Sequence, residues 1–127
     1  MKIYYAHPMA IYDTPQETRD IRTLQNLGFE VVNPNEQKHR DEVERIKRSL
    51  VSDKKDAVMY YFSTVVLKCN CLAFRALPGG FVPAGVAYEI EVANRNGLEI
   101  IELPSFSCRK ILTVEETVAY LQEVGQR

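Results

Sequence analysis

The chain has no excess of either charge, no long apolar run and few cysteines. Its 127 residues include 16 Lys and Arg against 17 Asp and Glu. This balance gives no overall field that would favour a nucleic acid polymer or an anionic membrane. The longest apolar runs, such as residues 65–67, fall far short of a bilayer span, and the N-terminus lacks the apolar segment of a signal peptide. We therefore expect a soluble, cytoplasmic protein that binds neither a membrane nor a nucleic acid polymer.

The three cysteines form no recognisable metal-binding or disulfide pattern. Cys69 and Cys71 have the i, i+2 spacing of a strand, and Cys108 lies far along the chain. A zinc site would need two more ligands, and His7 and His39 are distant in sequence. We expect reduced thiols in the core and no metal.

The glycine-rich segment 78–85 lacks the standard phosphate-binding motifs. It contains neither the dinucleotide fingerprint nor the Lys-Ser/Thr of a P-loop, which excludes a Rossmann NAD site and an NTPase. We expect no cofactor. Gly79 and Gly80 fit either a plain turn, the commoner role of such glycines, or a phosphate cradle of backbone N–H groups.

Strand and helix signals alternate along the chain, with no repeat or linker, and indicate a single domain over residues 1–127. Strands are expected at residues 2–6, 29–32, 71–74, 98–103 and 110–112. Helices are expected at residues 15–27, 39–68, 85–97 and from Thr113 to Gly125. The segment 39–68 fits two helices or one kinked helix equally well, with Ser52 and Asp53 as an internal cap.

The helix over residues 15–27 has the clearest start signal. Thr14 and Glu17 form a capping box, with Pro15 at the first helical position. An apolar stripe then follows at i, i+3 and i+6, and Gly28 supplies a left-handed stop. We expect this stripe, Ile21, Leu24 and Leu27, to face the core.

Alternating strands and helices predict an α/β fold, a flavodoxin-like three-layer sandwich with a four- to five-stranded parallel sheet. In such sheets ligands bind beyond the carboxyl ends of the strands. The loops that meet at this edge follow the first three strands. The candidate binding residues on or beside them are Tyr5, His7, Pro8, Met9, Asn33, Arg75, Gly79, Gly80 and Gly85. Arg75 and His7 are candidates to contact a phosphate or a base, the alternative for each being simple exposure to solvent.

The helix over residues 85–97 carries an acid at the edge of its apolar face. On a helical wheel Glu89 falls about 60° from Val86, whereas Glu91 falls about 140° away, on the solvent side. A carboxylate in the position of Glu89 is costly unless a ligand or a cation uses it. We expect a functional role for Glu89, the alternative being a buried partner for Arg or Lys.

The first strand offers a partner for this acid. A tyrosine hydroxyl can donate a hydrogen bond that orients a carboxylate and keeps it ionised for attack on an anomeric carbon. Tyr4 and Tyr5 point to opposite faces of the strand, so one of them must simply pack.

Three segments carry a family resemblance. They are Lys-Ile-Tyr-Tyr-Ala-His-Pro-Met at residues 2–9, Val-Val-Asn-Pro at 31–34, and Gly-Val-Ala-Tyr-Glu-Ile-Glu-Val-Ala at 85–93. Together they resemble the nucleoside 2-deoxyribosyltransferase superfamily, which includes the 2′-deoxynucleoside 5′-phosphate N-hydrolases. The resemblance spans roughly residues 2–103, and Gly-Val-x-Tyr-Glu is its most specific part.

The resemblance implies that Glu89 is a nucleophile that attacks C1′ of a nucleoside sugar and expels the base, and that Tyr4 orients it. It also implies transfer to another base or to water, and homodimers or higher oligomers with sites near the interface. Two positions depart from the family pattern. Pro83 replaces the aspartate of the transferases or the phosphate-holding serine of the nucleotide hydrolases, and Phe62 and Ser63 stand where an aspartate assists the leaving base.

Three functions therefore compete. The first is an enzyme that cleaves or exchanges the N-glycosidic bond of a nucleoside or nucleoside 5′-monophosphate. The second is a non-catalytic protein that binds or senses a nucleotide on the same fold, which Pro83 and the missing aspartate favour. The third is an interaction protein that uses the apolar surplus of residues 59–66 as an oligomer interface.

Overall fold

The computed structural model describes residues 1–104, 112–123 and 125, and its centre is a parallel β-sheet. The strands are β1 (Lys2–Ala6), β2 (Glu30–Val32), β3 (Cys71–Phe74) and β4 (Glu99–Glu102). Their order is β2-β1-β3-β4, and every neighbouring pair is parallel. This confirms the predicted flavodoxin-like α/β fold. Residues 110 and 111 of the predicted fifth strand lie outside the described residues.

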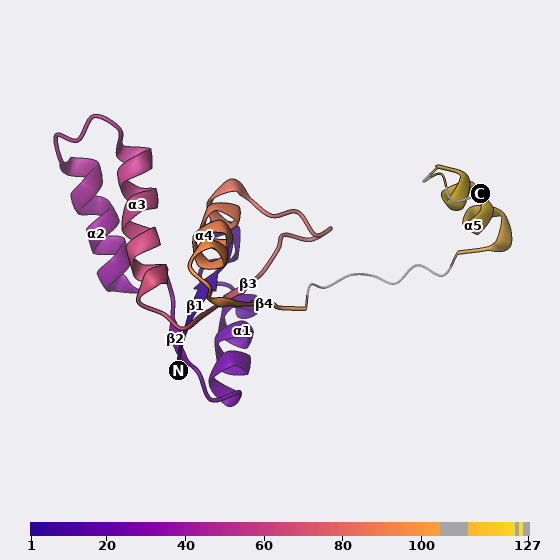
Figure 1. Ribbon diagram of the computed structural model, residues 1–127, viewed down its shortest axis with the longest axis horizontal. Coiled ribbons are helices and arrows are strands. Elements are labelled where there is room, and N and C mark those ends of the chain that lie inside the picture. Colours follow the sequence, from indigo (N-terminus) through magenta and orange to yellow (C-terminus); the bar gives the residue numbers. More distant parts are fainter. Residues whose placement is uncertain (105–111, 124, 126–127) are drawn as a thin grey trace.

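Helices follow each strand along the chain (Figure 1). They are η1 (Met9–Ile11), α1 (Pro15–Asn26), α2 (Gln37–Arg48), α3 (Lys54–Leu67), α4 (Ala84–Arg95) and α5 (Val114–Glu123). In Figure 1, α2 and α3 form a hairpin beside α4, and α1 lies on the other side of the sheet. None of the helices in the described part of the chain has the length and apolar character needed to cross a bilayer.

The sequence left open whether segment 39–68 forms one kinked helix or two helices. The structure has two helices there, α2 and α3. Asp53 ends the connecting loop, and its carboxylate accepts a hydrogen bond from the Asp56 N–H at 3.1 Å, which caps α3. The capping box at Thr113 is reciprocal, because Thr113 and Glu116 each accept from the other's backbone N–H, at 3.2 and 3.3 Å. These caps fix where α3 and α5 begin.

The capping box at the start of α1 is only half formed. The Thr14 hydroxyl accepts a hydrogen bond from the Glu17 N–H at 3.4 Å, but the Glu17 side chain turns away toward His7. At the other end of the helix, the prediction that Leu27 faces the core is wrong, since 66% of its surface is exposed. The chain reverses at Gly28 (φ 93°), and Phe29 packs against the core instead.

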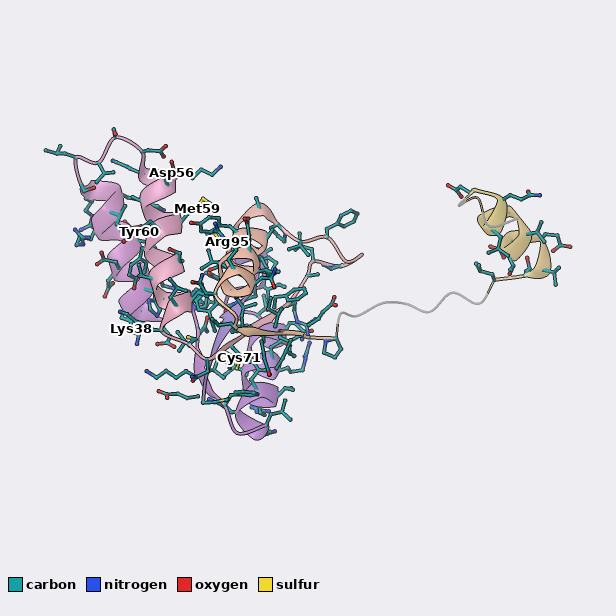
Figure 2. All side chains as sticks on the ribbon, viewed as in Figure 1. Lys38, Asp56, Met59, Tyr60, Cys71 and Arg95 are labelled. Atoms are coloured by element: carbon teal, nitrogen blue, oxygen red, sulfur yellow. The ribbon has the colours of Figure 1, made fainter. Side chains whose placement is uncertain are left out.

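The two faces of the sheet build separate cores. Tyr4, Leu72 and Cys69 pack on the side of α3 and α4, whereas Tyr5 and Cys71 pack on the side of α1. Cys71, labelled in Figure 2, lies at the sheet, and both of these cysteines are free and buried, as expected for core thiols. Cys108 lies outside the described residues. The alternation of β1 thus sends neighbouring tyrosines into different environments.

Candidate functional site

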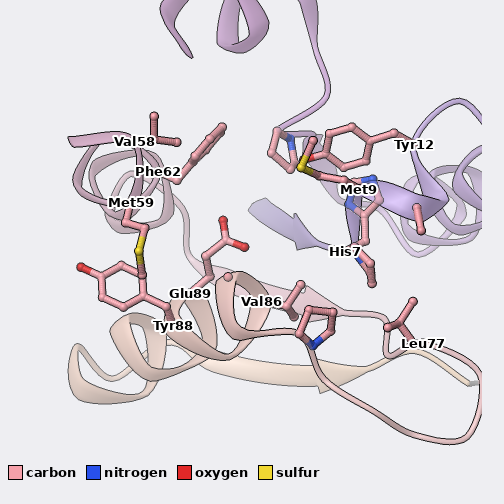
Figure 3. Close-up of a pocket in the computed structure, with 15 residues that line it drawn as sticks. His7, Met9, Tyr12, Val58, Met59, Phe62, Leu77, Val86, Tyr88 and Glu89 are labelled. Atoms are coloured by element: carbon pink, nitrogen blue, oxygen red, sulfur yellow. The ribbon is translucent and has the colours of Figure 1, made fainter. Parts of the chain in front are cut away.

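A cavity of about 460 Å³ opens at the carboxyl end of β1, between the loop after that strand, α3 and the start of α4 (Figure 3). Most of the side chains in its wall are apolar, and Glu89 is the one carboxylate among them. The loop after β1 contributes His7, Pro8, Met9, Ala10 and Tyr12, α3 contributes Val58, Met59 and Phe62, and the region of α4 contributes Leu77, Pro83, Gly85, Val86, Tyr88 and Glu89, with Pro34 from the loop after β2. A space of this size accommodates a small ligand such as a nucleoside.

Glu89 reaches this cavity from the second turn of α4 (Figure 3). The buried Tyr4 hydroxyl donates a short hydrogen bond to its Oε2 atom. Burial raises the pKa of Glu89 to about 7, and the hydrogen bond from Tyr4 opposes that rise. Burial, followed by the charge of Glu89, raises the pKa of Tyr4 well above its usual value, so Tyr4 remains a proton donor.

Glu89 has no cationic partner among the described residues. The alternative reading from sequence, a buried partner for Arg or Lys, therefore does not hold in the described part of the chain. A carboxylate that is held by a single phenol and faces an apolar cavity is poorly neutralised. Such a group favours a ligand that brings or develops positive charge next to it.

His7 lies in the cavity wall, but both of its ring nitrogens are used inside the protein. Nδ1 lies 2.9 Å from the Tyr5 carbonyl oxygen, and Nε2 lies 2.7 Å from Glu17 Oε2. Asn35 Nδ2 also donates to both Glu17 oxygens at 3.1 Å. Because both nitrogens already have partners inside the protein, neither is free to contact a ligand in the cavity.

The loops after β1 and β2 are tied together beside the cavity. Arg40 Nη2 lies 2.7 Å from Asp13 Oδ2, and Asn35 Nδ2 donates to Asp13 Oδ1 at 3.0 Å. The hydrogen bond from Arg40 lowers the pKa of Asp13. The predicted binding residue Asn33 takes part in this loop, where its Oδ1 accepts from the Asn35 N–H at 2.9 Å, and it does not line the cavity. The network fixes the loop that carries His7.

Arg75 is on the far side of the sheet from Glu89. It is buried, and its guanidinium pairs with Asp20, with Nη2 to Oδ1 at 2.8 Å. Tyr5 joins the same carboxylate through a hydrogen bond of 2.6 Å. This buried position contradicts the solvent-exposed alternative for Arg75, and burial contradicts the same alternative for His7.

Gly79 and Gly80 form a turn in the loop between β3 and α4. Both have positive φ, 89° and 84°, and the Gly80 N–H donates to the Leu77 carbonyl at 3.0 Å. Neither glycine lines the Glu89 cavity, whereas Gly85 does. The turn interpretation accounts for their geometry.

The sequence interpretation did not single out several wall residues. Tyr12, Tyr88 and Met59 all line the cavity, and burial, followed by the charge of Glu89, raises the pKa of Tyr12. Phe62 and Pro83, the departures from the family pattern, lie in the same wall. The surplus of apolar residues on α3 was the available signal, since a helix that is apolar all round must bury more than one face.

Comparison with known proteins gives no matching family model and no matching curated protein. Among the described residues, no group of three or more His, Cys, Asp or Glu side chains could hold a metal ion. Glu89, Tyr4 and the apolar cavity therefore define the candidate site.

Proposed function

We propose that the protein cleaves or exchanges the N-glycosidic bond of a nucleoside or nucleoside 5′-monophosphate, as its resemblance to the nucleoside 2-deoxyribosyltransferase superfamily implies. Glu89 is the nucleophile in this proposal, and Tyr4 orients it. The observation that carries the proposal is a carboxylate with no cationic partner in the described residues, held by the Tyr4 phenol at the wall of an apolar cavity.

In the first step, a Glu89 carboxylate oxygen forms a bond to C1′ of the sugar. The bond from C1′ to the base nitrogen breaks, and the base leaves with the electron pair and takes up a proton. In the second step, water or another base attacks C1′ and releases Glu89 as a carboxylate. The positive charge that develops on the sugar is stabilised by Glu89 more strongly in this apolar cavity than it would be in water.

The departing base needs a proton, and the cavity wall has no second carboxylic acid among its lining residues. Phe62 and Pro83 occupy the two positions where the resemblance leads one to expect polar groups. The hydroxyls of Tyr12 and Tyr88 are the O–H groups in the wall, and burial raises the pKa of Tyr12 further above neutral pH. We assign these two tyrosines as the candidates to contact the base.

The test is a panel of nucleosides and their 5′-monophosphates incubated with the protein, with free base measured by chromatography. Wild-type protein should release base from at least one member, and Glu89→Ala should release none. Unchanged release by Glu89→Ala would rule out the mechanism. A comparison of each nucleoside with its monophosphate identifies the substrate form.

A second candidate is a protein that binds or senses a nucleotide without cleaving it. Phe62 and Pro83 favour it, because both place apolar surface where catalytic polar groups are expected. Intact nucleotide that copurifies with the protein, with no free base after long incubation, would support this candidate over the enzyme.

Self-association is part of the same proposal. The exposed face of α3 carries Tyr60, labelled in Figure 2, and Leu67, with exposed fractions of 71% and 49%. A second copy of the chain is a natural cover for apolar side chains in this position. Sedimentation of wild-type protein and Tyr60→Glu should show a dimer or higher oligomer that the substitution weakens, and a monomeric wild type would contradict the proposal.

A further inference from the structure

The Glu89 cavity adjoins a second cavity, of about 690 Å³, along the groove between α2 and α3. The two cavities have a common wall. It consists of Met9, Tyr12, Pro34, Val58, Met59 and Phe62. Because these side chains border both spaces, the groove begins beside the Glu89 cavity.

The far part of this groove is cationic. Lys47 lines it from α2, and Lys54 and Lys55 line it from the first turn of α3. Glu44 is the one carboxylate among the lining residues, and it lies 4.0 Å from Lys47. Arg40 lines the groove too, but it is already paired. Three lysines therefore face one acid.

Lys54 and Lys55 are available to an anion. Among the described residues, neither ammonium lies within 4 Å of a carboxylate. The Lys54 ammonium donates to the Lys47 carbonyl at the end of α2, and the electrostatic interaction of Lys55 is with Asp56 at longer range. A carbonyl partner and a distant acid leave most of the positive charge of both lysines uncompensated.

The Glu89 cavity and the cationic end of the groove are separated along α3. Lys54 precedes Val58 by four residues and Phe62 by eight, which corresponds to about 6 and 12 Å along a helix axis. An anion at the lysines thus lies well away from Glu89, whose own negative charge would repel it at short range. Glu89 and the lysines of the groove are therefore far enough apart for an anion to bind the lysines without close contact with the Glu89 carboxylate.

We infer that the substrate carries a diphosphate arm, with the sugar and base in the Glu89 cavity and the outer phosphate between Lys47, Lys54 and Lys55. The inference depends on the proposed function for the position of the sugar and base, and it names the substrate class: a nucleotide with two linked phosphates. A nucleoside fills only the apolar cavity, and the second phosphate adds contacts at the cationic end of the groove.

The test is calorimetric titration of the Glu89→Gln protein, which leaves the ligand intact, with adenosine, AMP and ADP and with cytidine, CMP and CDP. In at least one series the diphosphate should bind at least tenfold more tightly than the nucleoside, with the monophosphate between them. Adding Lys54→Glu and Lys55→Glu together should remove this preference and leave the nucleoside Kd within about twofold. The matched control is Lys38→Glu on α2, because the Lys38 side chain is 71% exposed and lines neither cavity.

Equal affinity within each series, no binding by any of the six ligands, or an equal loss with Lys38→Glu would overturn the inference. The proposed function fails in a different way. A diphosphate preference that depends on the lysines, with no base released by wild-type protein, supports the groove and contradicts the glycosidic chemistry. Base release with no preference for phosphate supports the chemistry and overturns the groove.

Discussion

Two neighbouring tyrosines of β1 meet two carboxylates, and the two pairs differ in what surrounds the acid. Tyr5 donates to Asp20, which also accepts from Arg75 and from Gln16 at 2.8 Å each. Tyr4 donates to Glu89, which has no cation beside it in the described residues and faces a cavity. The Tyr5 side is a completed network, whereas the Tyr4 side is open to a ligand.

This difference separates a structural acid from the acid that we propose is reactive. Asp20 lies in a buried ion pair, whose role is to satisfy Arg75 and join α1 to the end of β3. Burial without a cation raises the pKa of Glu89 to about 7, so near neutral pH it exists in both protonation states. A nucleophile needs its carboxylate form, and the apolar wall makes that form more reactive toward a developing cation.

The largest effect is expected for Glu89→Gln. It should reduce base release by about 10⁴-fold or more, because the amide cannot form the covalent bond to the sugar. Chromatography of the products measures the loss. Circular dichroism should show an unchanged fold, and release within tenfold of the wild-type rate would contradict the assignment of Glu89 as nucleophile.

Asp20→Asn should reduce the stability of the fold and leave ligand binding close to that of wild type. Removing the charge leaves the buried Arg75 guanidinium unpaired, which costs about 3 kcal/mol of unfolding free energy. Urea denaturation measures this loss. Ligand affinity of the protein that remains folded should stay close to that of wild type, and a stability equal to that of wild type would show that the ion pair does not hold the fold.

The stability contributed by Glu89 should depend on pH. Its pKa is about 7 in the folded protein against 4.5 ordinarily, so between these values the folded state binds a proton that the unfolded state has lost. The stabilisation is complete below about pH 4.5 and disappears as the pH rises through about 7. Relative to Glu89→Gln, wild type should lose about 2 kcal/mol of unfolding free energy from pH 5 to pH 8. Parallel urea-denaturation curves for the two proteins would contradict the raised pKa.

The smallest effect is expected for Tyr4→Phe, with Tyr5→Phe as its matched control. Loss of the Tyr4 hydroxyl should lower kcat about tenfold and move the acid limb of the pH profile upward, because the hydrogen bond that lowers the Glu89 pKa is gone. Tyr5→Phe should cost about 1 kcal/mol of stability and leave the profile unchanged. A shift of the pH profile by the same amount in both variants would contradict the proposed difference between the Tyr4 and Tyr5 faces of the sheet.

Local signals predicted much of the fold. The strand at residues 71–74 and the start of α1 at Pro15 match the structure, because β-rich runs and capping residues act over a few positions. The site was less predictable. The helical wheel placed Glu89 at the edge of the core, but the pairing of Arg75 with Asp20 joins residues 55 positions apart. The walls formed by Tyr12 and Met59 likewise arise from packing between elements distant in sequence.

Peptide mass mapping of wild-type protein, acid-quenched during turnover of a nucleoside or nucleotide that releases base, is the most direct test of a glycosyl-glutamate intermediate. We expect the peptide containing Glu89 to gain the mass of the sugar unit, with its phosphate where the substrate carries one, and the peptide containing Asp20 to gain none. Base release at the same rate by Glu89→Gln, with no such adduct on the wild-type Glu89 peptide, would contradict covalent catalysis by Glu89.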